Sequence, residues 1–385
     1  MLTKNINFKN FNIRRSKIKI YFLFRKLLKE DNEILNSLKN TYVNSYSRKL
    51  ITKFKNFTEV VIIGIGGSIL GSRSIYNFLK DKIKKSFYFI DTFQFDSSKF
   101  KKKKLNLIIS KSGNTLETIS NSNFLIKKKD RNIFITESKN SYLMKFANQL
   151  KSEIIHHNDY IGGRYSVLSE VGMLPAELMG LKVNKFRNFN SLIKSKKYVD
   201  CLVQNVSNIL YLIKKKKFNS VILNYDDASS DLFFWYQQLV AESLGKKGKG
   251  ILPVISNMPK DNHSLMQLYL DGAKKNFYTF FFAEDTNIKK INNNNLLKTH
   301  FFLKGKTLNK VKHSQFEATQ KVFKSRNMPF RSFYIKKRNE ETLGELFVFF
   351  ILETILLGKA LDINPYDQPA VELIKKETKK NLMNT

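Results

Sequence analysis

Short apolar runs rich in β-branched and aromatic residues recur along the chain, and stretches with helical spacing of apolar residues separate most of them. Such runs predict buried strands, because a strand inside a parallel sheet is covered on both faces. The predicted strands are residues 60–63, 86–92, 105–110, 132–136, 220–225, 250–256, 277–283 and 330–335. Their alternation with helices indicates the α/β class, with helices on both faces of each sheet.

The pattern falls into two halves of similar type, separated by a break near residues 180–190. We therefore predict two doubly wound parallel-sheet domains with helical N- and C-terminal segments. The expected organisation is a helical segment at 1–50, a first domain at 51–185, a second domain at 186–360 and a C-terminal helix at 361–385. The most apolar stretch, Leu346 to Leu357, contains Glu353 and is too short to span a bilayer, so we expect a buried helix.

The chain is strongly basic, with 68 Lys and Arg against 32 Asp and Glu and a net charge of +36. The lysines form short scattered runs with no arginine-rich or aromatic-interleaved module, so we expect solvated faces and no nucleic-acid partner. The N-terminus lacks the apolar core of a signal peptide, and the single Cys201 excludes an intramolecular disulfide. We expect a cytoplasmic location, no membrane partner and no structural metal.

A first candidate anion site follows the strand at 60–63, where Gly64, Gly66 and Gly67 precede Ser68 at the start of a helix. Glycines at this place let backbone N–H groups approach an anion at a helix N-terminus. The third glycine of a dinucleotide fingerprint is missing, although Asp91 ends the next strand and could bind a ribose. A tight turn that only packs helix against sheet is the remaining alternative.

A second candidate site follows the strand at 105–110 and precedes a helix expected from Leu116. Its residues are Ser110, Lys111, Ser112, Gly113, Asn114 and Thr115. Three hydroxyl groups, a glycine and a helix N-terminus form a cup suited to a monophosphate. The alternative is an N-capping turn with serines on the surface.

Six segments together resemble, in order, the landmark segments of the phosphoglucose isomerase family. They are GIGGSILG (64–71), SKSGNTLET (110–118), GGRYSVLSEVGMLP (162–175), QQLVAESLGKKGKG (237–250), DNHSLMQ (261–267) and INPYDQPAVELIKK (363–376). The first two occur in sugar isomerase domains generally, whereas the later segments are much more specific to the family. The resemblance implies two sugar isomerase domains and interconversion of glucose 6-phosphate and fructose 6-phosphate through an enediolate, without a cofactor.

The resemblance also supplies the catalytic groups that such a reaction needs. Glu242 matches the carboxylate base, although a surface glutamate paired with Lys246 is the alternative. Arg164 matches the cation that stabilises the enediolate, with a solvent-exposed arginine as its alternative. His263 matches the ring-opening residue. The other histidines, His156, His157, His300 and His313, have no such context, and we expect ordinary roles for them.

The last motif places Gln368 and Lys375 seven residues apart, which predicts one face of a helix that has Pro369 in its first turn. Lys375 matches the family's lysine near the ring oxygen, with a basic helix end as its alternative. Ala370 and Ile374 stand where the family usually has glycine. With Gly163 before Arg164, these residues complete the expected sugar-phosphate site.

The resemblance further implies a homodimer in which the neighbouring subunit supplies the histidine. Two other functions remain open from the sequence: a non-catalytic sugar-phosphate sensor, and an isomerase that also accepts mannose 6-phosphate. A nucleotide-dependent oxidoreductase is disfavoured by the missing third glycine.

Overall fold

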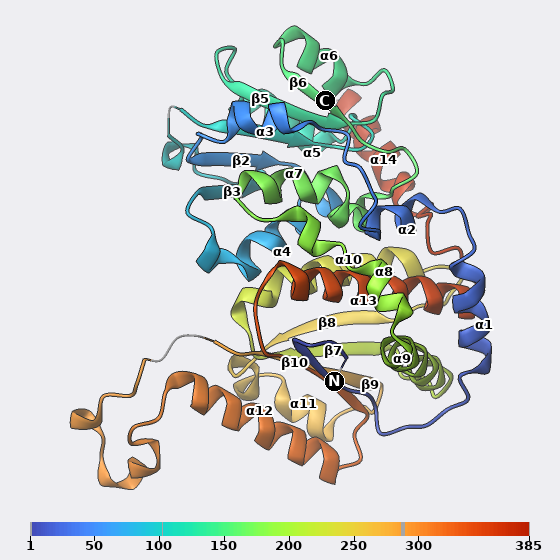
Figure 1. Cartoon of the computed structure of the whole chain (residues 1–385), viewed down its shortest axis with the longest axis vertical. Helices are drawn as coiled ribbons and strands as arrows, with labels where there is room; N and C mark the ends of the chain where they lie inside the picture. The colour runs from blue at the N-terminus through green and yellow to red at the C-terminus, as the bar shows by residue number, and fades with distance from the viewer. Residues whose placement is uncertain (1, 102, 286–288, 385) are drawn as a thin grey trace.

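The computed structural model describes residues 2–101, 103–285 and 289–384, which form an α/β fold around two five-stranded sheets (Figure 1). The first sheet is parallel throughout. Its strands in spatial order are β3 (Ser86–Ile90), β2 (Glu59–Ile63), β4 (Leu105–Ile109), β5 (Arg131–Thr136) and β6 (Glu153–His156). All lie within residues 51–185, and only β6 was not predicted.

The second sheet contains one antiparallel edge strand. Its order is β1 (Ile6–Lys9), β10 (Phe330–Ile335), β9 (Asn276–Ala283), β7 (Asn219–Asn224) and β8 (Leu252–Asn257). Strand β1 pairs antiparallel with β10, and the other pairs are parallel. The prediction that residues 1–50 are helical is therefore wrong at its start. Ile6 and Phe8 are buried because β10 provides a pairing edge from the far end of the chain.

Four helices, α4, α7, α10 and α13, lie between the two sheets (Figure 1). The helices are α1 (Ile18–Leu27), α2 (Glu33–Leu38), α3 (Arg48–Phe54), α4 (Leu70–Phe78), α5 (Leu116–Leu125), α6 (Tyr142–Gln149), α7 (Glu170–Leu178), α8 (Phe189–Lys194), α9 (Lys196–Lys214), α10 (Ser230–Leu244), α11 (Met266–Asp271), α12 (Leu308–Ser325), α13 (Glu340–Ala360) and α14 (Val371–Met383). Several begin at side-chain caps, such as Asn32 before α2 and Asn339 before α13.

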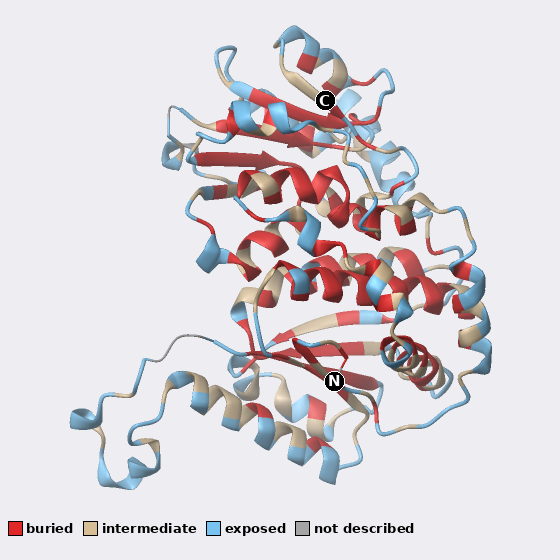
Figure 2. Cartoon of the chain, viewed as in Figure 1, coloured by how far each residue is buried: buried red, intermediate tan, exposed pale blue. Residues whose placement is uncertain are grey.

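This central helical layer and the inner strands of both sheets are largely buried (Figure 2). Nearly every residue of α13 is buried, including Leu346 to Leu357, so the prediction of a buried helix is confirmed. Along the described part of the chain, no helix has the length and apolar character needed to cross a membrane. Helix α14, in contrast, is exposed over almost its whole length.

The buried carboxyl group of Glu345 on α13 connects the N-terminal segment to the core. Thr3 Oγ1 donates a hydrogen bond to Glu345 Oε2 over 2.7 Å. Burial, with a smaller contribution from nearby Glu341, raises the pKa of Glu345 from 4.5 to about 7. The folded protein therefore binds a proton that the unfolded chain has already lost in this pH range.

We expect the free energy of unfolding of the wild type, relative to that of Glu345→Gln, to fall by about 2–3 kcal/mol as pH rises from 4.5 to about 7. The sign follows because a raised pKa gives a stabilisation that is complete below the unfolded value and lost as pH rises through the folded value. Urea unfolding of both proteins across this range measures the difference. A difference that does not change with pH would contradict the assigned pKa.

Candidate active site

Two glycine segments that the sequence keeps far apart pack directly against each other. A Cβ atom on Gly67 would lie 2.1 Å from the carbonyl carbon of Gly163, and Gly66 has a positive φ of 55°. The backbones of the β2–α4 loop and of the loop before Arg164 are thus in contact, which only glycine at position 67 permits. The alternative of a turn that merely packs one helix against its own sheet does not account for this contact.

We expect Gly67→Ala to destabilise the fold by about 1–3 kcal/mol, because the new methyl group would overlap the Gly163 backbone. Gly162→Ala is the matched control, because Gly162 has a φ of −65° and a Cβ there would meet only Tyr165 at 3.8 Å. The control should change stability by less than about 0.5 kcal/mol. Urea unfolding compares the two variants, and equal stabilities would contradict the close approach.

Arg164 is buried, so the alternative of a solvent-exposed arginine in a Gly-Gly turn is wrong. Its guanidinium donates hydrogen bonds to Ser243 Oγ (2.8 Å), Pro365 O (2.9 Å), Asp367 O (3.0 Å), Glu242 Oε2 (3.2 Å) and Gln368 Oε1. These partners come from α10 and from the segment before α14. The cation is therefore fixed in position.

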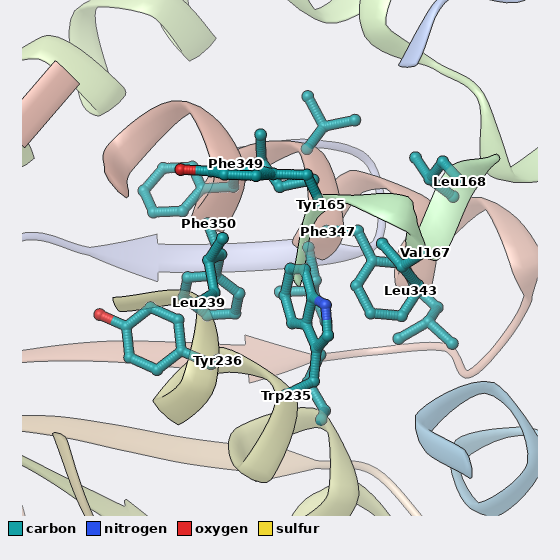
Figure 3. Packing of buried hydrophobic residues seen from close by; sticks show 14 of the residues in the cluster. Tyr165, Val167, Leu168, Trp235, Tyr236, Leu239, Leu343, Phe347, Phe349 and Phe350 are labelled. Atoms are coloured by element: carbon teal, nitrogen blue, oxygen red, sulfur yellow. The ribbon is translucent and has the colours of Figure 1, made fainter. Parts of the chain in front are cut away.

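An aromatic cluster supports the backbone of this arginine. Trp235 Nε1 donates to the carbonyl oxygen of Arg164 over 3.1 Å, and the Trp235 ring packs edge-on against Phe347 with centroids 4.8 Å apart. Figure 3 shows Trp235 among Phe347, Leu343 and Tyr165. The Tyr165 hydroxyl donates to the carbonyl of Pro365 over 2.9 Å. Buried aromatic residues thus fix the carbonyl group of Arg164 and the carbonyl group of Pro365, which the guanidinium contacts.

Glu242 lies in the last turns of α10, where 27% of its side chain is exposed. One carboxylate oxygen accepts from Arg164, and the other accepts from Gln238 Nε2 over 2.8 Å. Lys246 pairs with Asp367 at 2.7 Å, so the surface pair of Glu242 with Lys246 is not formed. Gln238 is a site residue that sequence reasoning missed. Its position four residues before Glu242 on one helix could have indicated it.

The loop at 110–115 lies beside the first glycine loop, because a Cβ on Gly64 would be 3.0 Å from the carbonyl oxygen of Ile109. Ser110 is buried, and its hydroxyl group shares a 2.8 Å hydrogen bond with that of Thr115. Thr115 is the N-cap residue of α5, but its side chain makes no hydrogen bond to the first N–H groups of the helix. The alternative of a turn that serves only to cap α5 therefore does not describe this loop. The first N–H groups of α5 therefore remain able to bind an anion.

The other polar side chains of this loop have protein partners. Lys111 Nζ donates to the carbonyl oxygen of Asp159 over 2.6 Å and lies 3.4 Å from Glu137. The side-chain oxygen of Asn114 accepts from the N–H of Tyr142 over 3.0 Å. A phosphate contact through Lys111 or Asn114 therefore stays a prediction, as does one through Ser68 or Ser112.

His263 ends a short 3-10 helix (Lys260–His263) after β8 and is exposed. Asp261 holds this turn by accepting from the N–H of Asn257 over 2.7 Å. Within the described residues, no hydrogen bond or ion pair connects His263 to Glu242 or Arg164. A single chain thus leaves the histidine apart from the predicted base, and its role stays a prediction.

Gln368 and Lys375 do not share a helix face, so that part of the sequence prediction is wrong. Helix α14 begins at Val371, and Gln368 lies in the preceding segment, where it contacts Arg164. The helix starts late because Arg164 and Lys246 hold Asp367 in the segment before it. Lys375 is exposed and pairs with Glu372 at 2.6 Å, so its catalytic role stays a prediction.

The residue considered for ribose binding has another partner. Asp91 forms an ion pair with Arg73 of α4 at 2.8 Å. This pair joins the end of β3 to α4. Because the carboxylate already has a cationic partner, the alternative of a dinucleotide site is disfavoured further.

Comparison with known proteins shows the family of the chain. The phosphoglucose isomerase family profile matches residues 14–384. The glucose-6-phosphate isomerase of Methanocaldococcus jannaschii is 32% identical over 85% of each chain, and the probable glucose-6-phosphate isomerase of Methanococcus maripaludis is 31% identical over 97% of this chain and 89% of its own.

Solved structures agree on the fold. A hypothetical protein from Thermus thermophilus has a TM-score of 0.82 at 24% identity and 94% coverage of both chains. A glucose-6-phosphate isomerase from Chlamydia trachomatis has a TM-score of 0.70 at 17% identity, with 91% of this chain and 77% of that chain covered. Because the family profile matches residues 14–384, this chain belongs to the phosphoglucose isomerase family.

Proposed function

We propose that this protein is a glucose-6-phosphate isomerase that interconverts glucose 6-phosphate and fructose 6-phosphate in glycolysis and gluconeogenesis. The observation that carries the proposal is the contact between Glu242 and Arg164 over 3.2 Å beside the glycine loops. Aldose-ketose isomerisation needs a base that can visit both C1 and C2 and a cation for the developing oxyanion. The two side chains supply these groups, and family membership supports their roles.

The phosphate group of the substrate would bind where two loops meet at the carboxyl edge of the first sheet. The backbone of Gly66, Gly67 and Ser68 forms one side of this site. The segment from Ser110 to Thr115 and the N-terminus of α5 form the other side. Anions are stabilised at such a place by free N–H groups and by the helix dipole.

In the proposed reaction Glu242 removes the proton from C2 of the open-chain aldose and returns it to C1. The electron pair of the C–H bond moves into an enediolate, whose negative oxygen is stabilised by the charge of Arg164. The hydroxyl proton of O2 passes to O1 in the enediolate, so that the carbonyl group forms at C2 when C1 takes up its proton. The guanidinium has donors only and takes no part in the proton transfer. Gln368 would help to orient Arg164, which it contacts directly.

Ring opening is assigned to a histidine from a second copy of the chain. Because His263 is exposed and separate from Glu242 in one chain, we propose a homodimer in which the partner subunit's His263 completes the site. Lys375 would then approach the ring oxygen. Sedimentation equilibrium should give twice the chain mass of 45.0 kDa, and a fully active monomer would contradict this arrangement. We further propose a cytoplasmic location, which the single, unpaired Cys201 supports.

A coupled assay of the purified protein on fructose 6-phosphate tests the function. We expect glucose 6-phosphate to form at the same rate with and without a metal chelator. Mannose 6-phosphate in a parallel assay measures substrate breadth. No turnover of fructose 6-phosphate, or turnover that the chelator abolishes, would refute the proposed function.

A further inference from the structure

The loop at residues 157–170 leaves β6, carries Arg164 near its middle and ends at the start of α7. His157 and Glu170 stand at its two ends, and both side chains are only 1% exposed. His157 Nδ1 contacts Glu170 Oε1, so the pair closes the loop across its base. The sequence predicts only an ordinary role for His157, and the proposed reaction does not use this pair.

Both ring nitrogens of His157 face acceptors. Nε2 lies 3.0 Å from the carbonyl oxygen of Ile161, which accepts hydrogen bonds only, so Nε2 carries a hydrogen atom. Nδ1 faces Glu170, whose carboxyl group also accepts from the N–H of Asn158 and from the hydroxyl group of Tyr42, each over 3.2 Å. These two donors favour the ionised form of the Glu170 carboxyl group, and an ionised carboxylate only accepts, so Nδ1 is assigned as a third donor.

The charged surroundings agree with an ionised Glu170. Burial alone would raise the pKa of Glu170, but the hydrogen bond and charge of His157, together with the backbone N–H groups of Glu170 and Asn158, lower it. The other charged groups near the pair are Glu33 on α2, which accepts from Asn158 Nδ2 over 2.8 Å, and Arg187, which donates to the carbonyl oxygen of Tyr42 over 3.1 Å. The site therefore contains two carboxylates and one arginine beside the imidazole.

The hydrogen bond to Ile161 fixes the chain immediately before a pair of glycines. Gly162 and Gly163 follow, and two successive glycines have more backbone freedom than any other residue pair. On the far side of these glycines, Trp235 holds the carbonyl oxygen of Arg164 over 3.1 Å. With an anchor on each side, the backbone of Arg164 is held in place. From that position its guanidinium reaches Glu242 and Ser243.

We propose that His157 is a positioning residue for Arg164, donating from Nδ1 to Glu170 and from Nε2 to the carbonyl oxygen of Ile161. The inference rests on the proposed isomerase function and adds a residue to it. His157 does not touch the substrate; it acts through Ile161 and the Gly-Gly pair. Loss of the Ile161 anchor loosens Arg164, and the transition state loses part of its electrostatic stabilisation.

Two conservative variants separate this role from simple packing. In His157→Gln the amide nitrogen takes the place of Nε2 and keeps the donor to Ile161, whereas in His157→Asn it takes the place of Nδ1 and keeps the donor to Glu170. We expect kcat of His157→Asn to fall by about 10- to 100-fold and that of His157→Gln to stay within about 3-fold of the wild type. The KM of both should change little, because the loops of the phosphate site are untouched.

His156→Gln is the control, because His156 is exposed and its ring shares a 3.0 Å hydrogen bond with the surface residue Ser138. It should leave kcat unchanged. Equal kcat values for the Asn and Gln variants at position 157, when both unfold at the same temperature, would overturn the positioning role. A rise in KM with unchanged kcat would overturn it as well.

A second measurement does not depend on turnover. The chain has five histidines, so nitrogen-15 NMR of histidine-labelled protein, compared with His157→Gln, identifies the signals of His157. We expect a proton on each ring nitrogen in the folded protein, because each nitrogen faces an acceptor, and a single protonated nitrogen would overturn the inference. An inactive wild type with a doubly protonated His157 would refute the proposed function alone.

Discussion

Glu242→Gln is expected to lower kcat by about 10²- to 10⁴-fold, the usual contribution of a general base to proton transfer. The variant keeps the shape of the side chain and one oxygen that can accept from Arg164 or Gln238, both of which bind Glu242 in the native protein. It removes only the basic group that would carry the proton between C2 and C1. Steady-state kinetics on fructose 6-phosphate measure the effect, and KM should stay within about 3-fold because the phosphate site is unchanged.

Glu153→Gln is the matched control for this prediction. Glu153 undergoes the same chemical change on the surface, where its carboxylate pairs with Lys53 at 2.5 Å and is 38% exposed. Its kcat should equal that of the wild type. If Glu242→Gln were as active as this control, Glu242 would not be the base, and the assignment of the reaction to the Arg164 site would fail with it.

Most strands of both sheets, all except β1 and β6, were predictable because parallel strands are buried on both faces and so appear as continuous apolar runs. Strand β1 was missed for a physical reason: Ile6–Lys9 has one apolar side only, and its partner β10 lies more than 300 residues away in sequence. Local composition does not reveal such a distant pairing edge. The start of α14 was misplaced in the same way, because tertiary contacts of Asp367 override the helical pattern around Pro369.

The site was predictable in its residue types but not in its geometry. The sequence indicates Arg164 and Glu242 through a family resemblance, yet their contact joins residues 78 positions apart. The same holds for Gly67 and Gly163, whose close approach is visible only in three dimensions. His263 and Lys375 match family motifs but are exposed in the single chain, so their catalytic roles stay predictions.

Arg331→Met is expected to destabilise the protein by about 3–5 kcal/mol, because it leaves the carboxylate of Glu353 buried without its cation. Both side chains are fully buried and form an ion pair between β10 and α13. Asn205 of α9 and Tyr236 of α10 donate to the same carboxylate, so the network joins the helices around the core. Although burial opposes it, Glu353 raises the pKa of Arg331 further above its usual value. Urea unfolding measures the loss.

The double variant Arg331→Met/Glu353→Leu tests the cause of that loss. If the unpaired charge dominates, the double variant should recover about 1 kcal/mol or more relative to Arg331→Met, since replacing both ions removes the desolvation penalty. The remaining cost comes from the hydroxyl group of Tyr236 and the amide of Asn205, which lose an acceptor.

Lys17→Met is the surface control, because Lys17 and Asp200 pair at 3.1 Å with 39% and 37% of their side chains exposed. It should cost less than about 1 kcal/mol. If Arg331→Met lowered the free energy of unfolding no more than Lys17→Met does, the result would contradict a buried, charged pair between β10 and α13.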